Sequence, residues 1–465
     1  MENIKFVGRE KELLKLKELN NQNFFLIVRG RRRIGKTLLL RKSFPQAIYL
    51  FIWPDKSLSW ILEQISKEYS LPHFRDFGSL LSYLLDQEKV VIIDEFQNFL
   101  NVDKSVYGEI QKIIDQRKHG GAALKLAVAG SSYSLMDKVF YDGASPLYGR
   151  RTHEVNLKNL SIVSLFKELK ISLEEFIQLW SVFEGVPYYY EFIDLKKSAK
   201  NNIFNLVLSK NSQLSGEGNA ILSVEFGKDS KTYNTVLTSI SEGKTKLNEI
   251  ASVFNDKKNE VIKYLSILRR NFNLVTKITP IDENPKKSRI GKYQINDNFL
   301  SFWFYFYDRN QPYIEQRRFE ELKQFFESQF DNYVGKKFEK FMLELIKENL
   351  IFSEDSYETA GNQWGKTETG TYEIDILALS KNNKILFGEC KWSREVNPLE
   401  VLNKLEKKLK YVLVNRNGKE EVLVIFAKSF SKKVTEFGGK RVYCLDLGDI
   451  EKLLKGKKVL NNLSS

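Results

Sequence analysis

Two short segments near the start of the chain carry side chains that could bind and hydrolyse a nucleoside triphosphate. Gly30–Thr37 has the sequence GRRRIGKT, in which the glycines allow backbone amides to surround phosphate oxygens. Lys36 would reach the β- and γ-phosphates, and the Thr37 hydroxyl would ligate magnesium. Asp94 and Glu95 follow an apolar run, where Asp94 would orient the magnesium ion and Glu95 would polarise the attacking water. Together the two segments predict an ATP-hydrolysing site.

The flanking residues predict the elements that would hold this site. Asn23–Arg29 is a buried strand that leads directly into the glycine loop, and Leu38–Lys42 begins a helix whose N-terminus faces the phosphates. Leu124–Gly130 is a further apolar strand, and it ends in Ser131 and Ser132. One of these serines could sense the γ-phosphate, or they could only cap the next helix. The residues expected to contact the nucleotide at the loop are Gly30, Arg31, Arg32, Arg33, Ile34, Gly35, Lys36, Thr37 and Leu38.

Two arginines follow Gly149 at the start of another strand-like segment. Arg150 or Arg151 could stabilise transition-state charge, either within one chain or across a subunit boundary. The second arrangement requires a nucleotide-dependent homo-oligomer. Each arginine could equally form a surface ion pair.

Four motifs occur together in the first part of the chain: Phe6–Glu10 (FVGRE), the Asp94–Glu95 pair, Gly149–Arg151 and Glu184–Pro187 (EGVP). In this order they resemble the archaeal ATPase family of the STAND branch of AAA+ proteins, over residues 1–310. The resemblance implies that the FVGRE segment lies near the adenine and that EGVP belongs to a helical lid that reports nucleotide state. The residues that take these roles by resemblance are Val7, Gly8, Arg9 and Pro187.

The middle of the chain predicts a DNA-binding module. Helices at Thr235–Ile240, Leu247–Phe254 and Asn259–Asn271 are followed by strands at Leu274–Ile278 and Lys292–Ile295, which is the order of a winged helix-turn-helix. Its basic residues would face the phosphate backbone of duplex DNA, or they could form only a solvated face of a packing or protein-contact module. These residues are Lys257, Lys258, Lys263, Arg269 and Arg270 on the third helix, and Lys286, Lys287 and Arg289 at the wing tip.

A second set of chemical residues lies on a predicted hairpin near the C-terminus. Asp375 falls on one strand, and Glu389 and Lys391 fall on one face of the next, so that two carboxylates and a lysine converge. Asp375 and Glu389 would ligate magnesium, and Lys391 would position or activate water for phosphodiester cleavage. This part resembles the PD-(D/E)XK nuclease superfamily, which implies Glu339 on the preceding helix as an additional ligand. The alternatives are a surface salt-bridge ladder for the hairpin and an exposed helix charge for Glu339.

Composition narrows the class of protein. A formal charge of +14 favours an anionic partner, although the same lysines could only maintain solubility. Two cysteines and three separated histidines argue against a disulfide framework and a zinc site. The longest aromatic run, Phe299–Tyr307, is far shorter than a bilayer span and predicts a helix wedged between domains. We therefore expect a cytoplasmic protein with no membrane segment.

These patterns predict a multidomain α/β protein. The expected units are a parallel-sheet P-loop ATPase domain at residues 1–158, a helical lid at 159–230, a winged helix-turn-helix at 231–310, and an α/β restriction-endonuclease-like domain at 311–465. The expected function is ATP hydrolysis coupled to DNA binding, with magnesium-dependent nuclease activity in the last domain. The alternative is a nucleotide-gated signalling switch that binds a protein partner through an inactive nuclease-like domain.

Overall fold

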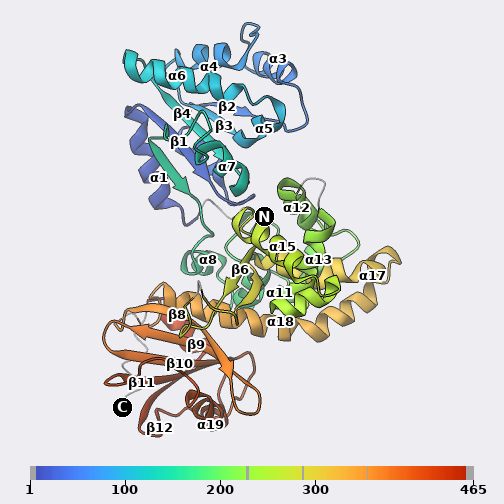
Figure 1. Ribbon diagram of the computed structural model, residues 1–465, viewed down its shortest axis with the longest axis vertical. Coiled ribbons are helices and arrows are strands. Elements are labelled where there is room, and N and C mark those ends of the chain that lie inside the picture. The colour runs from blue at the N-terminus through green and yellow to red at the C-terminus, as the bar shows by residue number, and fades with distance from the viewer. Residues whose placement is uncertain (1–6, 227–229, 285–286, 353, 457–465) are drawn as a thin grey trace.

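Three regions follow one another along the long axis of the molecule (Figure 1). The computed structural model describes residues 7–226, 230–284, 287–352 and 354–456. An α/β region lies at one end, a mostly helical region lies in the middle, and a second α/β region lies at the other end. Phe6 of the FVGRE segment and Lys286 of the predicted wing lie outside the described residues.

The first region is built on a five-stranded parallel sheet, which confirms the predicted sheet type. The strand order is β2-β3-β4-β1-β5, so β4 lies between the strand before the glycine loop and the strand that ends in Asp94. Because all strands run in one direction, their carboxyl ends meet at one edge, where ligands of such sheets bind. The strands are β1 (Phe24–Arg29), β2 (Ile48–Phe51), β3 (Val91–Asp94), β4 (Lys125–Gly130) and β5 (His153–Asn156).

Helices cover both faces of this sheet, which explains why the central strands are continuous apolar runs. On one face, Phe24, Leu26 and Val28 pack with α1 (Glu10–Lys17) and α2 (Lys36–Ser43). On the other face, Phe25 and Ile27 pack with four helices. These are α3 (Leu58–Glu68), α4 (Phe77–Leu85), α6 (Val106–Gly120) and α7 (Tyr133–Phe140), and the short α5 (Phe99–Val102) lies beside them.

The predicted lid is helical, but it shares its core with later parts of the chain. Almost the whole of α9 (Leu173–Phe183) is buried, and it packs against α11 (Ala199–Ile203), α16 (Asn298–Phe302) and α18 (Phe319–Lys347). The remaining elements of this segment are α8 (Ile162–Leu169), α10 (Pro187–Tyr190), the π-helical turn Phe204–Leu208 and α12 (Glu217–Phe226). Residues 159–226 are therefore joined to the C-terminal region by continuous packing.

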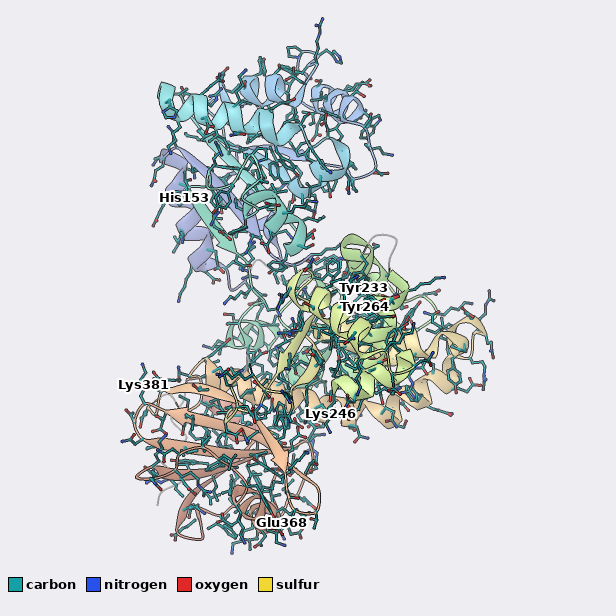
Figure 2. The ribbon with its side chains drawn as sticks, viewed as in Figure 1. His153, Tyr233, Lys246, Tyr264, Glu368 and Lys381 are labelled. Carbon is teal, nitrogen blue, oxygen red and sulfur yellow. The ribbon has the colours of Figure 1, made fainter. Side chains whose placement is uncertain are left out.

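Three helices and a two-stranded antiparallel ribbon complete the middle region. They are α13 (Ser230–Ser241), α14 (Leu247–Ala251), α15 (Lys258–Arg270), β6 (Val275–Ile278) and β7 (Lys292–Ile295). The first helix begins five residues before the predicted Thr235. Figure 2 shows Tyr233 of α13 beside Tyr264 of α15, and their ring centroids are 5.8 Å apart. The aromatic run forms α16 and the π-helical turn Trp303–Tyr307, in which Trp303, Phe304 and Phe306 are buried.

A single long helix leads into the last region. The sequence indicates helical character over Phe319–Phe330 and Tyr333–Asn349, and the structure has one helix of 29 residues, α18, over both stretches. No glycine or proline interrupts Asp331–Asn332, and the buried stripe continues from Phe330 to Val334, so the helix is continuous. α18 packs across β8, β9 and β10 of the C-terminal sheet. α17 (Gln311–Glu315) precedes it.

The last region is a six-stranded mixed sheet in the order β12-β13-β11-β10-β9-β8. β8, β9 and β10 form an antiparallel meander, and Figure 2 marks its two turns with Glu368 and Lys381 at opposite ends of the sheet. α19 (Pro398–Leu409) connects β10 to β11, which run parallel, and α20 (Leu447–Leu454) follows β13. The strands are β8 (Tyr357–Lys366), β9 (Thr371–Ser380), β10 (Lys384–Lys391), β11 (Glu420–Ala427), β12 (Glu436–Phe437) and β13 (Lys440–Asp446). Across the described ranges, no helix is both long and apolar enough to span a membrane.

Candidate functional sites

The glycine loop lies between β1 and α2, at the carboxyl edge of the first sheet. A side chain at Gly30 would place its Cβ 2.7 Å from the carbonyl oxygen of Leu157, and Gly35 has φ +95°, so both positions require glycine. The Lys36 ammonium is buried and donates to the carbonyl oxygens of Gly30 (2.9 Å) and Arg31 (3.1 Å). Burial lowers the pKa of Lys36, although Glu95 and Asp94 act in the opposite direction. Lys36 thus lies at the edge where a phosphate would lie.

Thr37 and Asp94 form a direct hydrogen bond at the carboxyl edge of the sheet, although β4 lies between the strands that precede them. The Thr37 hydroxyl donates to Asp94 Oδ2 at 2.5 Å, and the Tyr49 hydroxyl donates to the same oxygen at 2.9 Å. A hydroxyl and a carboxylate oxygen at this edge are the hard ligands that Mg²⁺ prefers, so the donor set fits the predicted ion. Tyr49 was not predicted, because it lies on β2 and reaches Asp94 only through the strand order.

Glu95 is held in place by two side chains from neighbouring elements. Ser131 Oγ donates to Glu95 Oε2 at 2.7 Å, and Gln97 Nε2 donates to the same oxygen at 2.5 Å. The backbone of Glu95 has φ 52°, a strained conformation that the surroundings must maintain. Ser132 instead caps α7 by accepting from the backbone N–H of Leu135. Of the two serines, Ser131 is therefore the one that faces the site.

The loop arginines are bound by acidic residues from outside the sheet. Arg31 pairs with Glu184 (3.5 Å) and with Asp297, and Arg33 pairs with Glu217 (2.8 Å). Arg33 also lies 3.9 Å from the ring centroid of Tyr188. Arg31 and Arg32 line a cavity of about 250 Å³ between the loop and the middle region, together with Ser131, Tyr133 and Asp297. These arginines anchor the loop to α10, α12 and the segment before α16.

Glu184 extends this anchoring to the C-terminal region. Its carboxylate is 7% exposed and accepts from Lys340 of α18 as well as from Arg31. Lys340 also donates to Asn298 Oδ1 at 3.0 Å and to the carbonyl oxygen of Asn296 at 3.3 Å. Burial on its own would raise the pKa of Glu184, but Lys340 and Arg31 outweigh it and lower the pKa. One buried carboxylate therefore joins the glycine loop to α18.

The FVGRE and EGVP residues pack around the loop. The Arg9 guanidinium is buried and donates to the carbonyl oxygens of Lys158 (2.5 Å) and Ile34 (3.4 Å), and burial lowers its pKa. Gly8 has φ +68° and packs against α8, and Val7 is half-buried. Pro187 begins α10, and its Cγ lies 3.9 Å from where a Cβ on Gly35 would be. The adenine and lid roles of these residues stay predictions.

Arg150 and Arg151 lie at the opposite edge of the sheet. Thr152, the next residue, bonds to Phe25 at the start of β1, so these arginines are about 13 Å or more from the glycine loop along the strand. Arg150 forms a two-point ion pair with Asp115 at 3.0 Å, and Arg151 pairs with Glu154. Arg150 is therefore held away from the phosphate edge, whereas Arg151 shares the Glu154 carboxylate with Arg29 at the end of β1, and the catalytic role of either arginine stays a prediction. Sequence spacing could not show this, since it does not fix which end of a strand a residue meets.

The hairpin brings its three predicted residues together. Gly388 pairs with Ile376, which places Glu389 beside Asp375. Lys391 Nζ lies 2.7 Å from Glu389 Oε2 and 3.6 Å from Asp375 Oδ2. Lys408 of α19, which was not predicted, donates to Glu389 Oε1 at 2.6 Å. The hairpin sequence could not predict Lys408, because this lysine lies on the crossover helix that follows the hairpin.

Glu339 of α18 faces the same group of charges. Burial and then Asp375 raise the pKa of Glu339 to about 8, and burial and then Glu389 raise the pKa of Asp375 to about 6. Within the described ranges, however, no three His, Cys, Asp or Glu side chains are arranged to hold a metal ion. Both Glu389 oxygens are taken by lysines, and Asp375 Oδ2 accepts from the backbone N–H of Cys390 (2.8 Å). The magnesium set Glu339, Asp375 and Glu389 does not fit an ion in this arrangement.

The basic residues of the middle region are mostly exposed, but the β6–β7 ribbon contacts the C-terminal sheet. Lys258, Lys263, Arg269 and Arg270 are exposed on α15, and Lys257 pairs with Glu260. Two contacts hold the ribbon against the C-terminal sheet: Lys292 pairs with Glu373 at 2.8 Å, and Trp364 Nε1 donates to the carbonyl oxygen of Ile290. At the tip, Lys287 and Arg289 are exposed.

Solved structures with some similarity include a Walker-type ATPase and an ORC2 protein. The Walker-type ATPase PABY2304 of Pyrococcus abyssi matches with a TM-score of 0.47 and 17% identity, over 64% of this chain and 95% of that chain. The ORC2 protein of Aeropyrum pernix matches with a TM-score of 0.30 and 13% identity, over 69% of this chain and 94% of that chain. Both scores are too low to establish a shared overall fold.

Two family models match parts of the chain, and one curated protein matches nearly all of it. Residues 22–165 match an AAA domain, and residues 303–408 match a family described as archaeal and bacterial proteins of unknown function. The uncharacterized protein MJECL04 of Methanocaldococcus jannaschii is 32% identical over 445 residues, covering 92% of this chain and 97% of that protein. The chain therefore belongs to the same family as MJECL04 and carries an AAA domain within it.

Proposed function

We propose that this protein binds and hydrolyses ATP with magnesium at the glycine loop. The observation that carries this proposal is the direct contact of Thr37 with Asp94, beside a Glu95 that Ser131 and Gln97 hold in place. The AAA-domain match over residues 22–165 supports it. Thr37 and Asp94 would hold the ion, which supplies charge neutralisation for the phosphates when bound.

The roles of the chain's own groups follow from their positions. The amides at the N-terminus of α2 and the Lys36 ammonium would bind the phosphate oxygens. Glu95 would orient the attacking water and accept its proton, since Ser131 and Gln97 share one carboxylate oxygen and leave the other open. Lys36 would reach the phosphates after giving up its hydrogen bonds to the carbonyl oxygens of Gly30 and Arg31.

Two variants test this proposal separately for binding and for chemistry. Lys36→Ala should abolish ATP binding in calorimetric titration. Glu95→Gln should keep ATP binding but lower the hydrolysis rate by about 100-fold or more, because the water loses its base. Wild-type protein that binds no ATP, or a Glu95→Gln variant that hydrolyses ATP at the wild-type rate, would refute the proposal.

A second function, cleavage of nucleic acid, is supported by the convergence of Asp375, Glu389 and Lys391 on adjacent strands. We interpret the C-terminal sheet as nuclease-like and Glu339 as the further carboxylate of its site. Because Lys391 and Lys408 occupy Glu389, cleavage would first require a rearrangement that frees this carboxylate.

A plasmid-nicking assay with magnesium, with and without ATP, tests this second function. Asp375→Asn should abolish nicking and leave ATP hydrolysis unchanged. The matched control is Glu358→Gln on β8, whose exposed pair with Lys381 lies outside the cluster. If wild-type protein cuts neither DNA nor RNA under any of these conditions, the region serves as a contact module of a nucleotide-gated switch.

The helices α13–α15 with the β6–β7 ribbon have the order of a winged helix, and we propose that α15 contacts duplex DNA through its exposed basic face. Removing Lys263 and Arg270 together should weaken duplex binding and reduce the salt dependence of log K by about 0.9 per lost phosphate contact. Lys404→Ala on the exposed face of α19 serves as control. Duplex affinity that is insensitive to salt would argue instead for a protein partner.

A further inference from the structure

A second cavity, of about 210 Å³, lies between the middle region and α18. Three lysines of α18, Lys336, Lys337 and Lys340, line one side, and Thr245 and Ser301 add hydroxyl groups. Tyrosine rings, apolar side chains and the polar residues Ser241, Gln294 and Asn332 form the rest of the wall. No carboxylate lines the cavity among the residues that the structure describes, so its lining can carry positive charge only. The glycine-loop site does not include any of this lining.

In the part of the chain that the structure describes, Lys337 forms no direct ion pair, although the more distant carboxylates of Glu184 and Asp297 favour its charged form. Its Nζ donates to Ser301 Oγ at 3.2 Å and lies 5.4 Å from the ring centroid of Tyr333. Lys336 likewise forms no ion pair within the described ranges. Burial and then the neighbouring Lys340 lower the pKa of Lys337 to about 7. Holding such an ammonium charged is costly unless an anion accompanies it.

The shape and composition of the cavity specify the kind of anion. A hydroxyl beside two lysine side chains that form no ion pair with a described residue matches a phosphate group, which accepts several hydrogen bonds and favours the charged form of both lysines. Tyr293 and Tyr305, with Ile240 and Ile295, offer apolar and aromatic surface next to the lysines. Such a mixture suits a small molecule with a ring and a phosphate, and a concave site of this size suits it better than a continuous duplex.

We propose that this cavity binds a nucleotide-like small molecule, with its phosphate between Lys336 and Lys337 against the Ser301 hydroxyl and its ring against the tyrosines. The site is separate from the glycine loop but is linked to it. Lys340 lines the cavity and also pairs with Glu184, whose other partner is Arg31 of the loop. A phosphate in the cavity would draw Lys340 away from Glu184 and so weaken the ion pairs that hold the glycine loop against α18.

The experiment uses the full-length chain carrying Lys36→Ala, so that the glycine loop does not contribute nucleotide binding. Adenosine monophosphate and inorganic phosphate are titrated calorimetrically at pH 7.5, and a short DNA duplex is titrated in parallel. We expect the monophosphate to bind and to bind more tightly than inorganic phosphate. We also expect proton uptake on binding, measured in buffers of different ionisation enthalpy, because the phosphate would restore the charge of Lys337.

Adding Lys337→Met should weaken monophosphate binding by about tenfold or more and remove the proton uptake. Ser301→Ala should weaken monophosphate binding by a smaller factor. This second variant tests the site without removing a charged side chain from the protein. The control Lys323→Met removes a lysine from the same helix, 14 residues and about 21 Å away, and should leave binding unchanged. No monophosphate binding, binding of the duplex alone, or equal losses with Lys337→Met and Lys323→Met would overturn the proposal.

Discussion

The ion pairs of Glu184 give a direct test of how strongly the glycine loop is tied to α18. Glu184→Gln keeps the shape of the side chain but leaves two cations, Arg31 and Lys340, without this buried counter-charge. Breaking a buried pair costs about 3–5 kcal/mol. We expect Glu184→Gln to lower the stability by about 3 kcal/mol, at the lower end of this range. The reason is that Arg31 still pairs with Asp297 and Lys340 still donates to two neutral oxygen atoms.

Hydrogen exchange is the suitable assay, since a chain of several regions does not unfold as one unit. A loss of about 3 kcal/mol should speed exchange of the protected amides of α9 and α18 by about 150-fold. The control is Glu174→Gln, because Glu174 also joins two cations, Arg394 and Lys428, but is 26% exposed. That change should cost about 0.5 kcal/mol and speed exchange about twofold.

The pH dependence has a definite sign. The pKa of Glu184 is lowered in the folded chain, so its contribution is fully present above the pKa of the unfolded chain, about 4.5, and is lost as pH falls through the lower folded value. The difference between wild type and Glu184→Gln should therefore disappear in acid. A difference below about 1 kcal/mol at pH 7, or simple additivity of Glu184→Gln with Lys340→Met, would refute the reasoning.

Three further outcomes follow from the two sites. Ser131→Ala should lower the hydrolysis rate about tenfold with unchanged ATP affinity, measured by phosphate release, because Glu95 loses one of its two donors. Arg150→Ala should leave hydrolysis by the isolated chain unchanged, and a loss that appears only at high protein concentration would show action across subunits. Glu339→Gln should remove a fall in stability between about pH 5 and pH 8, because the raised pKa of Glu339 means that folding favours its protonated form and wild type loses this stability as the carboxyl ionises. At pH 8.5 we expect the wild type to have lost about 2 kcal/mol of stability relative to Glu339→Gln. This is less than the whole pKa shift of Glu339 implies, because the side chain is partly exposed. Thermal unfolding midpoints between pH 5 and pH 8.5 measure the difference.

The sequence predicted features that depend on local order and missed those that depend on packing. The glycine loop, its strand and its helix are adjacent in the chain, and the hairpin of Asp375 and Glu389 has a short turn, so spacing alone places these residues. Tyr49 and Lys408 come from separate elements, and only the strand order and the position of α19 bring them to the sites.

Strand register and packing also decide features that spacing leaves open. Arg150 precedes β5, and the parallel register puts that end of the strand beside the start of β1. The buried stripe on both sides of Asp331 keeps α18 continuous. The pairs of Arg31 and Arg33 could not be read from the motif, since their partners lie more than 150 residues later.

The continuity of α18 is what gives these contacts a shared consequence. Glu339 and Lys340 are consecutive, so their side chains leave the helix about 100° apart, one toward Asp375 and the other toward Glu184. A displacement of α18 as a rigid element would move Lys340 and Glu339 together. The charge that Glu339 and Asp375 can hold depends on their separation and burial, because like carboxylates disfavour each other's ionised form. Two ion pairs and one helix therefore form a continuous path of contacts from the glycine-loop arginines to the C-terminal carboxylates.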